Sequence, residues 1–228
     1  MFTSQISTIC PFTTPNLSWC EIAFDHEDAH ELSHQDENLG LVQIALPAHL
    51  ARAVPKRKSE FLAGRACAAF ALRQLAYPED VPIQGNRSPH WPNGIAGSIS
   101  HTGNRAIAVV SSHFEAVGVD CEQIMQKDQA NKIRSMILTD DEAHLRPANL
   151  PFEVFLTLVF SAKEAFYKSI SKDVGRILDF HEVVLISVTD RILSFSFSGK
   201  IANASWLLGN GDCVTLVALP LAADFRQK

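Results

Sequence analysis

Hydrophobic residues recur three and four positions apart over residues 59–76, which is the spacing of one face of an α-helix. Ser59 is a residue type that caps helix starts, and Pro78 follows where a helix has to end, so we expect a helix between them. A longer pattern of the same kind predicts a second apolar-faced helix over residues 151–170.

Shorter apolar runs that are bounded by turn residues predict strands. The expected strands are residues 19–24, 97–100, 105–111 and 116–121, followed late in the chain by 183–188, 192–197, 204–208 and 213–219. We expect residues 112–115 to join the third and fourth of these strands as a β-hairpin.

Helices and strands do not alternate regularly, which predicts the α+β class with antiparallel or mixed sheets. Two parts of similar size meet near residue 115, so we expect an N-terminal half over residues 1–115 and a C-terminal half over residues 116–228. His26, His30 and His34 recur every four residues in an acidic stretch with few apolar anchors. This setting favours a solvated helix or loop over a metal site.

The composition is that of an ordinary soluble globular protein, with 46% hydrophobic and 20% charged residues among 228. A net charge of −5 argues against a dedicated nucleic-acid binder, which usually has a basic balance. The charge is unevenly distributed, because all 20 Lys and Arg lie after residue 51 whereas seven of the 25 acidic residues come before it.

Cysteine use and hydropathy predict the compartment. The five cysteines are scattered and contain no C-x-x-C pair, so we expect neither a disulfide framework nor a zinc site, but reduced thiols in a cytoplasmic protein. Residues 1–11 lack the basic and apolar segments of a signal peptide. No run approaches the ~18 apolar residues that a membrane span needs.

Two carboxylates end the strand predicted at 116–121. Residues two apart in a strand point to the same side, so Asp120 and Glu122 lie together while Val119 and Cys121 face the core. Adjacent carboxylates repel each other, and a hard divalent cation relieves the repulsion. The alternative is an exposed strand end with two solvated acids.

A second pair of charges closes the apolar helix predicted at 151–170. Glu164 and Lys168 are one turn apart on one face. They are either a surface ion pair or part of a lined site, in which Glu164 supplies a third metal ligand and Lys168 covers the charge of a bound phosphate.

Two further segments carry groups suited to anions. A Pro- and Gly-rich loop from Trp91 runs into Ser100 and His101, which can present a hydroxyl, an imidazole and backbone N–H groups. Arg57 and Arg65 are about two helical turns apart and share a face if the helix begins early. A structural loop and a solvated basic face are the alternatives.

Together, in this order and spacing, four segments resemble the phosphopantetheinyl transferases, most closely the enterobactin synthase component D type that serves siderophore synthesis. They are KRKSEFLAGRACAAFAL (56–72), NRSPHWPNGIAGSISHTG (86–103), AVGVDCE (116–122) and FSAKEAFYKS (160–169). The resemblance implies a fold of two similar α+β halves, forming one pseudo-twofold unit with the active site in the cleft between them. It implies transfer of 4′-phosphopantetheine from coenzyme A to a serine of an apo carrier protein, with release of adenosine 3′,5′-bisphosphate.

The resemblance also implies roles for single residues. Mg²⁺ would be held by Asp120, Glu122 and Glu164, and Lys168 would contact the phosphate next to pantetheine. The contacts to coenzyme A would come from Arg57, Arg65, Arg87, Ser100, His101, Asp120, Glu164 and Lys168. The catalytic residues would be Asp120, Glu164 and Lys168. We expect Glu164 to act as the base on the carrier serine, directly or through a water on the metal.

Two positions depart from the resemblance without changing the expected activity. Cys121 stands where relatives often carry an aliphatic or acidic residue, and residues 84–86 lack lysines that some relatives have. We expect a monomer that meets coenzyme A and an acyl, peptidyl or aryl carrier protein. A coenzyme A binding homologue without transfer activity and a Mg²⁺-dependent phosphohydrolase are the alternatives.

Overall fold

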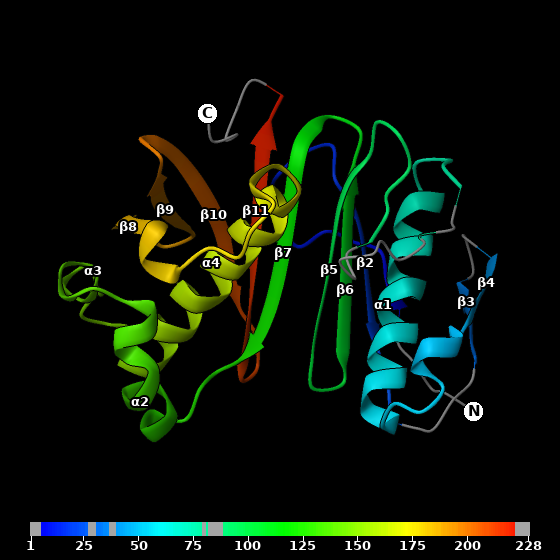
Figure 1. Cartoon of the computed structure of the whole chain (residues 1–228), viewed down its shortest axis with the longest axis horizontal. Helices are drawn as coiled ribbons and strands as arrows, with labels where there is room; N and C mark the ends of the chain where they lie inside the picture. The colour runs from blue at the N-terminus through cyan, green and yellow to red at the C-terminus, as the bar shows by residue number, and fades with distance from the viewer. Residues whose placement is uncertain (1–5, 27–30, 37–39, 79–80, 82–88, 222–228) are drawn as a thin grey trace. The chain divides into compact units, whose positions relative to one another are not determined.

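The computed structural model describes residues 6–26, 31–36, 40–78, 81 and 89–221. The chain divides into two compact units, Met1–Ser112 (unit 1) and His113–Lys228 (unit 2), which Figure 1 shows in blue to green and in green to red. Each unit contains an antiparallel sheet and a long helix, so the α+β class is confirmed. Within the described residues, none of the helices is both long and apolar enough to span a bilayer.

In unit 1, the helix α1 covers a four-stranded sheet with the order β1-β2-β6-β5. A two-stranded hairpin, β3-β4, also packs against α1. The elements are β1 (Ile6–Ser7), β2 (Ser18–Ala23), β3 (Glu31–Asp36), β4 (Gly40–Ala45), η1 (Ala48–Leu50), α1 (Pro55–Arg73), β5 (Ala96–Thr102) and β6 (Arg105–Ser111).

Helix α1 begins earlier than the sequence pattern predicts. Pro55 is its first residue and Val54 its N-cap, because the fixed φ of proline suits the first helical position. The expected cap, Ser59, lies one turn inside the helix, where its hydroxyl donates to the carbonyl oxygen of Pro55 at 3.0 Å. The early start places both Arg57 and Arg65 on α1.

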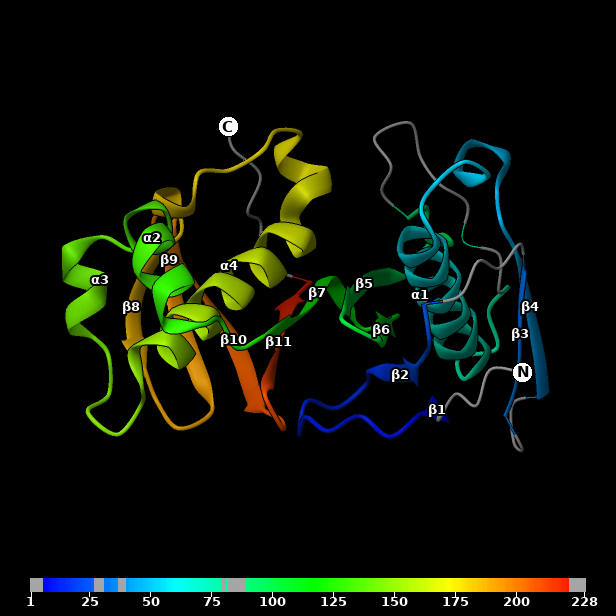
Figure 2. The same cartoon turned by 90° about the horizontal axis from the view of Figure 1, so that it is seen from below.

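In unit 2, the order of the five-stranded sheet is β7-β11-β10-β9-β8. Figure 2 shows α4 lying along one face of this sheet, where it packs on β7, β10 and β11. The elements are β7 (Phe114–Gln123), α2 (Lys127–Ile137), α3 (Asp140–His144), α4 (Phe152–Val174), η2 (Phe180–Glu182), β8 (Val184–Val188), β9 (Ile192–Phe197), β10 (Lys200–Leu208) and β11 (Asp212–Pro220).

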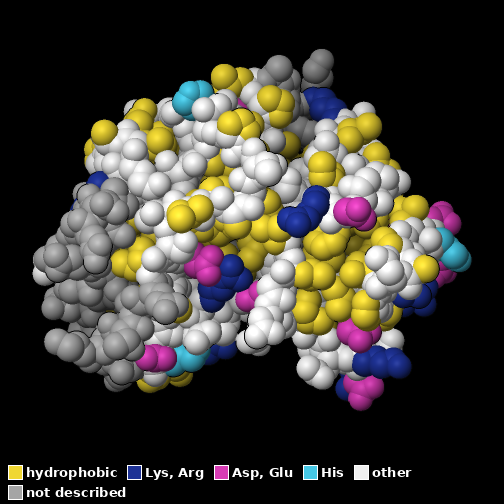
Figure 3. All heavy atoms as spheres, turned by 180° about the vertical axis from the view of Figure 1, so that it is seen from behind, with side chains coloured by type: hydrophobic (Ala, Val, Ile, Leu, Met, Phe, Trp, Pro, Cys, Tyr) yellow, Lys and Arg dark blue, Asp and Glu magenta, His cyan; other side chains and the backbone are white. Residues whose placement is uncertain are grey.

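The opposite face of this sheet carries several exposed apolar side chains. In the register of the sheet, Val184 and Ile201 both lie opposite Ser196, whose neighbours Phe195 and Phe197 point into the core. Val184, Ile186, Ile192 and Ile201 are exposed. Figure 3, viewed from behind, shows hydrophobic side chains reaching the surface among charged and polar ones.

Two local predictions were wrong. The expected hairpin at 112–115 does not form, because β6 pairs with β2 and β5 whereas β7 pairs with β11, about a hundred residues later in the chain. His34 lies in strand β3 rather than in a helix or loop, while His30 lies outside the described residues. The pairing of β3 with β4 decides its structure, which the spacing of histidines does not indicate.

Strand β7 comes very close to the backbone of helix α4 at Gly118. A Cβ atom added there would lie 1.8 Å from the carbonyl oxygen of Ala165 and 3.0 Å from the amide nitrogen of Ser169. Strand β7 therefore touches the backbone of α4 directly, which only glycine permits.

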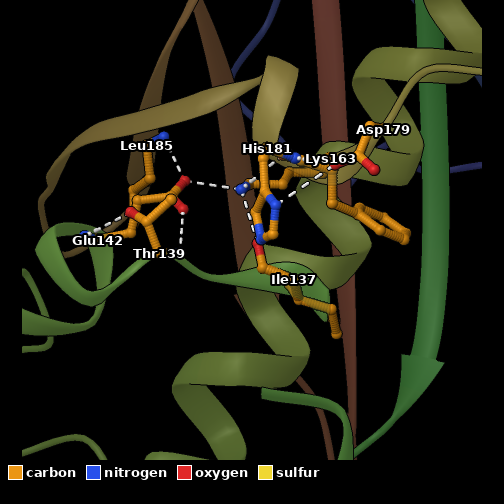
Figure 4. Close-up of polar contacts among 8 residues, drawn as sticks. Ile137, Thr139, Glu142, Lys163, Asp179, His181 and Leu185 are labelled. Atoms are coloured by element: carbon orange, nitrogen blue, oxygen red, sulfur yellow. Dashed lines mark hydrogen bonds and ion pairs between the residues drawn. The ribbon is translucent and has the colours of Figure 1, made fainter. Parts of the chain in front are cut away.

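A buried lysine on α4 forms hydrogen bonds with residues of α2, α3 and η2. Figure 4 shows Lys163, whose ammonium donates to the Glu142 carboxylate at 2.6 Å and to the carbonyl oxygens of Ile137 and Phe180. The same Glu142 oxygen accepts the backbone N–H of Leu185 at 2.7 Å. Burial lowers the pKa of Lys163, and its ion pair with Glu142 opposes that shift. Such a buried pair is costly to break at one end.

The five cysteines are free thiols. No disulfide joins any two of the five, all of which lie in described residues. Cys20, Cys67, Cys121 and Cys213 are fully buried, whereas Cys10 is half-buried.

Replacement of Gly118 by alanine is expected to lower the free energy of unfolding by about 3 kcal/mol, because the obstacle is backbone and cannot rotate away. Ala116→Gly is the control, since it makes the opposite exchange two residues earlier on β7 and should cost about 1 kcal/mol. Denaturant unfolding of both variants measures the difference. A Gly118→Ala variant as stable as the parent protein would contradict the close packing of β7 on α4.

Candidate functional site

The two carboxylates of β7 lie on the side that faces α4. They share this side with Gly118, whose missing side chain is what lets α4 approach. Asp120 is 3% exposed, and Glu122 is partly exposed at the end of the strand. Val119 and Cys121, which the alternation of a strand turns to the opposite side, are fully buried, as the sequence predicts.

Helix α4 places Glu164 and Lys168 next to the carboxylates of β7. Lys168 Nζ donates to Asp120 Oδ1 at 2.6 Å and to the carbonyl oxygen of Val119 at 3.3 Å. Ala165, which contacts Gly118, lies between Glu164 and Lys168 on the helix. The structure therefore joins the motif of the strand to the motif of the helix.

The electrostatics show that the three carboxylates interact. Burial raises the pKa of Glu122 to about 7, with a further increase from the charges of Asp120 and Glu164 and an opposing effect from Lys168. Burial and the Asp120 charge also raise the pKa of Glu164. Concentrated negative charge of this kind favours a bound cation or retained protons.

Carboxylate oxygens are the ligands that hard divalent cations prefer, so the chemistry of Asp120, Glu122 and Glu164 fits Mg²⁺. In the part of the chain that the structure describes, no three His, Cys, Asp or Glu side chains are already arranged to hold a metal ion, and this includes these three carboxylates. The ammonium of Lys168 is the cation that contacts Asp120.

A buried polar layer from β11 lies beside these carboxylates. Thr215 and Cys213 stand opposite Asp120 and Glu122 in the register of the two strands. The Thr215 hydroxyl shares a 2.9 Å hydrogen bond with Ser161 on α4. Burial raises the pKa of Cys213 to about 12, so this thiol is no nucleophile at neutral pH. Only the pairing of β11 with β7, which no local pattern indicates, could have pointed to this layer.

Unit 1 contains a cavity of about 350 Å³ between α1 and β5. It is lined by His49, Leu50, Arg57, Glu60, Phe61, Gly64, Arg65, Pro89, Ile99 and His101. The structure thus brings Arg57, Arg65 and His101 to one cavity that has cationic groups and apolar walls.

The cationic groups of the cavity are held in different ways. Arg65 is 8% exposed, donates to the carbonyl oxygen of Val81 at 2.6 Å and stacks on the ring of Phe61 at 5.3 Å. Arg57 is more exposed, and its Nη1 lies 3.4 Å from His101 Nε2. The arginine that can reorient toward a ligand is therefore Arg57.

Two expected contacts are not placed at the cavity by the structure. Ser100 is 4% exposed and lies on the side of β5 opposite His101, which lines the cavity. Arg87 lies outside the described residues. Trp91 packs on Gly97, where a Cβ would come within 2.5 Å of the indole ring, so the Trp-Pro loop is fixed against the start of β5.

Glu60 and His49 line the cavity but were not among the predicted site residues. Glu60 sits one turn after Lys56 and one turn before Gly64 on α1, a spacing that could have suggested a shared face once the start of the helix was known.

Family models match both units. Residues 46–111 match the 4′-phosphopantetheinyl transferase N-terminal domain, and residues 116–220 match the 4′-phosphopantetheinyl transferase superfamily.

Curated relatives agree with this match. The enterobactin synthase component D of Salmonella typhimurium is 37% identical over 185 residues, which are 76% of this chain and 77% of the relative. The 4′-phosphopantetheinyl transferase Svp of Streptomyces mobaraensis is 31% identical, over 85% of both chains. The 4′-phosphopantetheinyl transferase PptT of Mycobacterium tuberculosis is 32% identical, over 68% of this chain and 67% of the relative. Identity of this extent, together with the two model matches, shows that the chain belongs to the 4′-phosphopantetheinyl transferase superfamily and is a transferase enzyme.

Proposed function

We propose that this transferase moves 4′-phosphopantetheine from coenzyme A to a serine hydroxyl of an apo carrier protein and releases adenosine 3′,5′-bisphosphate. The observation that carries the proposal is the contact of Lys168 with Asp120, beside two carboxylates whose pKa values are raised. A phosphate-binding cation and a proton acceptor then stand together, as phosphoryl transfer requires.

Coenzyme A has one phosphate group for the residues around Lys168 in unit 2 and another for the residues that line the cavity of unit 1. Lys168, whose side chain is 29% exposed, is proposed to bind the phosphate next to pantetheine. Arg57 and His101 are proposed to bind the 3′-phosphate in the cavity of unit 1, with Arg65 as a further positive charge on its wall. Ser100 and Arg87 stay predicted contacts.

Asp120, Glu122 and Glu164 are proposed to hold Mg²⁺. When bound, the ion supplies positive charge that neutralises the carboxylates and the phosphate oxygens of coenzyme A. The donor set of three carboxylates, two with raised pKa values, supports this assignment.

Glu164 is proposed to take the proton of the carrier serine. The serine oxygen then forms a bond to the phosphorus joined to pantetheine, and the bond from that phosphorus to the departing adenosine bisphosphate breaks. A carboxylate with a raised pKa holds a proton better at neutral pH than an ordinary glutamate, which supports its role as a base.

The carrier is proposed to be a peptidyl or aryl carrier domain of siderophore synthesis. The support is the set of relatives that bear the name enterobactin synthase component D. The five cysteines without disulfides support a reducing compartment such as the cytoplasm. We further propose a monomer, because a single chain supplies all the site residues named above.

Glu164→Gln is expected to abolish transfer while coenzyme A still binds, because the amide cannot accept the serine proton. Mass spectrometry of an apo carrier incubated with coenzyme A and Mg²⁺ measures transfer, and calorimetry measures binding. Glu153→Gln, the same exchange at the start of α4, should stay active. Transfer by Glu164→Gln at the parent rate would contradict the assignment of the base. A parent protein that binds coenzyme A but modifies no carrier would contradict the proposed function.

Arg57→Ala is expected to raise the KM for coenzyme A about tenfold, with a much smaller effect on dephospho-coenzyme A, which lacks the 3′-phosphate. Steady-state kinetics with both substrates tests this. Arg73→Ala, at the other end of α1, should leave both KM values near those of the parent. An equal rise for the two substrates would show that Arg57 does not contact the 3′-phosphate.

The metal-free protein should become less stable as the pH rises from about 5 to 7.5. The pKa of Glu122 is about 7 in the folded protein and about 4.5 in the unfolded chain. Between these values the unfolded chain has lost the proton that the folded protein still binds. The free energy of unfolding therefore falls as the pH rises through this window. Unfolding in the presence of a chelator measures the effect, and Glu122→Gln should flatten the curve. Superimposable curves for the two proteins would contradict the raised pKa.

A further inference from the structure

A carboxylate lines the cationic cavity of unit 1, where an anion would meet repulsion. Glu60 lies within ion-pair distance of three groups: Lys56 Nζ at 3.9 Å, Arg57 Nη1 at 4.0 Å and His101 Nδ1 at 3.7 Å. Its side chain is only 11% exposed, whereas those of Lys56 and Arg57 are more than half exposed. The buried position distinguishes Glu60 from the carboxylate of an ordinary surface pair, which stays in water.

The imidazole of His101 stands between this carboxylate and an arginine. Its Nδ1 edge faces Glu60, and its Nε2 lies 3.4 Å from Arg57 Nη1. A carboxylate attracts a protonated nitrogen, and a guanidinium can only donate. When the imidazole is neutral, both neighbours therefore favour the tautomer with the proton on Nδ1, which leaves Nε2 as the acceptor from Arg57.

The packing of α1 on β5 fixes this arrangement. A Cβ at Gly64 would lie 2.9 Å from Ile99 Cγ2, so the helix and the strand are in close contact there. Glu60 is one turn before Gly64, and His101 is two residues after Ile99 on the same side of its strand. The carboxylate and the imidazole are thus brought together by the elements that build the cavity.

We propose that Glu60 is a positioning residue for anion binding, and this rests on the proposed binding of the 3′-phosphate in the cavity. Glu60 holds the Nδ1 side of His101 and so aims Nε2 at the point that Arg57 also reaches. When the phosphate arrives, Nε2 takes up a proton and donates to it together with Arg57. Glu60 stabilises the resulting imidazolium, because an opposite charge at this distance favours the charged form.

Among the described residues at the cavity, two elements contribute charged or titratable groups near His101. Helix α1 contributes Lys56, Arg57, Glu60 and Arg65, and η1 contributes His49. Replacement of Glu60 by glutamine removes a negative charge 3.7 Å from the imidazole, and a nearby negative charge favours the protonated form. We therefore expect the imidazole to lose its proton more readily in a Glu60→Gln variant.

The test is an NMR titration of the histidine side chains in the free protein, with His101→Asn to assign the His101 signal. The midpoint for His101 should fall by roughly one pH unit in Glu60→Gln. In Glu60→Asp, which keeps the charge, it should stay nearer to the parent value. Glu21→Gln is the matched control, since Glu21 pairs with Arg105 in the same unit and is absent from the cavity lining. Equal midpoints in the parent and Glu60→Gln would overturn the proposal.

A second measurement keeps this result separate from the proposed function. The dissociation constant of adenosine 3′,5′-bisphosphate should rise more between pH 6 and pH 8 in Glu60→Gln than in the parent, by up to about sixfold when the His101 midpoint lies one pH unit lower. The comparison of two pH values matters because the loss of a negative charge also strengthens phosphate binding at every pH. A lowered midpoint without any binding of the bisphosphate would overturn the proposed anion site while leaving the Glu60–His101 contact. Binding with the same pH dependence in both proteins would overturn the role of Glu60.

Discussion

The contact between the backbones of β7 and α4 at Gly118 and Ala165 governs the C-terminal part of the site. Asp120 follows Gly118 by two residues, and Glu164 and Lys168 flank Ala165 within one helical turn. A side chain at position 118 would force the strand and helix apart. The 2.6 Å contact between Lys168 and Asp120 would then be lost, together with the interactions among charges that help to raise the pKa of Glu122. The absence of one Cβ is thus a requirement of the chemistry as much as of the packing.

The two sets of site residues are electrostatic opposites. In unit 2, the ammonium of Lys168 interacts electrostatically with three carboxylates, whereas in unit 1 several groups that are or can become cationic lie near the carboxylate of Glu60. Lys168 contacts Asp120 at 2.6 Å, and Glu60 lies within 4.0 Å of three groups that are or can become cationic. A cluster of like charges at low exposure is costly, and one opposite charge reduces that cost while keeping the excess that attracts a ligand.

Local patterns predicted much of the fold, because many elements are amphipathic on their own. The strands Arg105–Ser111 and Ile192–Phe197 lie where the sequence places them, and the alternation along β7 correctly pairs Asp120 with Glu122. Long-range pairing explains the failures. A turn-like segment at 112–115 follows β6, but the partner of β7 is β11, and the layer of Ser161 and Thr215 exists only once that pairing forms. Glu60 was missed because its neighbour His101 comes from another element.

The burial of the cysteines has a practical consequence. Four of the five thiols are buried in the interior, and Cys213, opposite Glu122 in the sheet, has a pKa of about 12. Cys10 alone is half-buried, at a position remote in sequence from every proposed site residue. A maleimide dye added under mildly alkaline, native conditions should therefore label a single position without any prior mutagenesis. The enzyme as it stands thus offers a single attachment point for fluorescence or surface immobilisation.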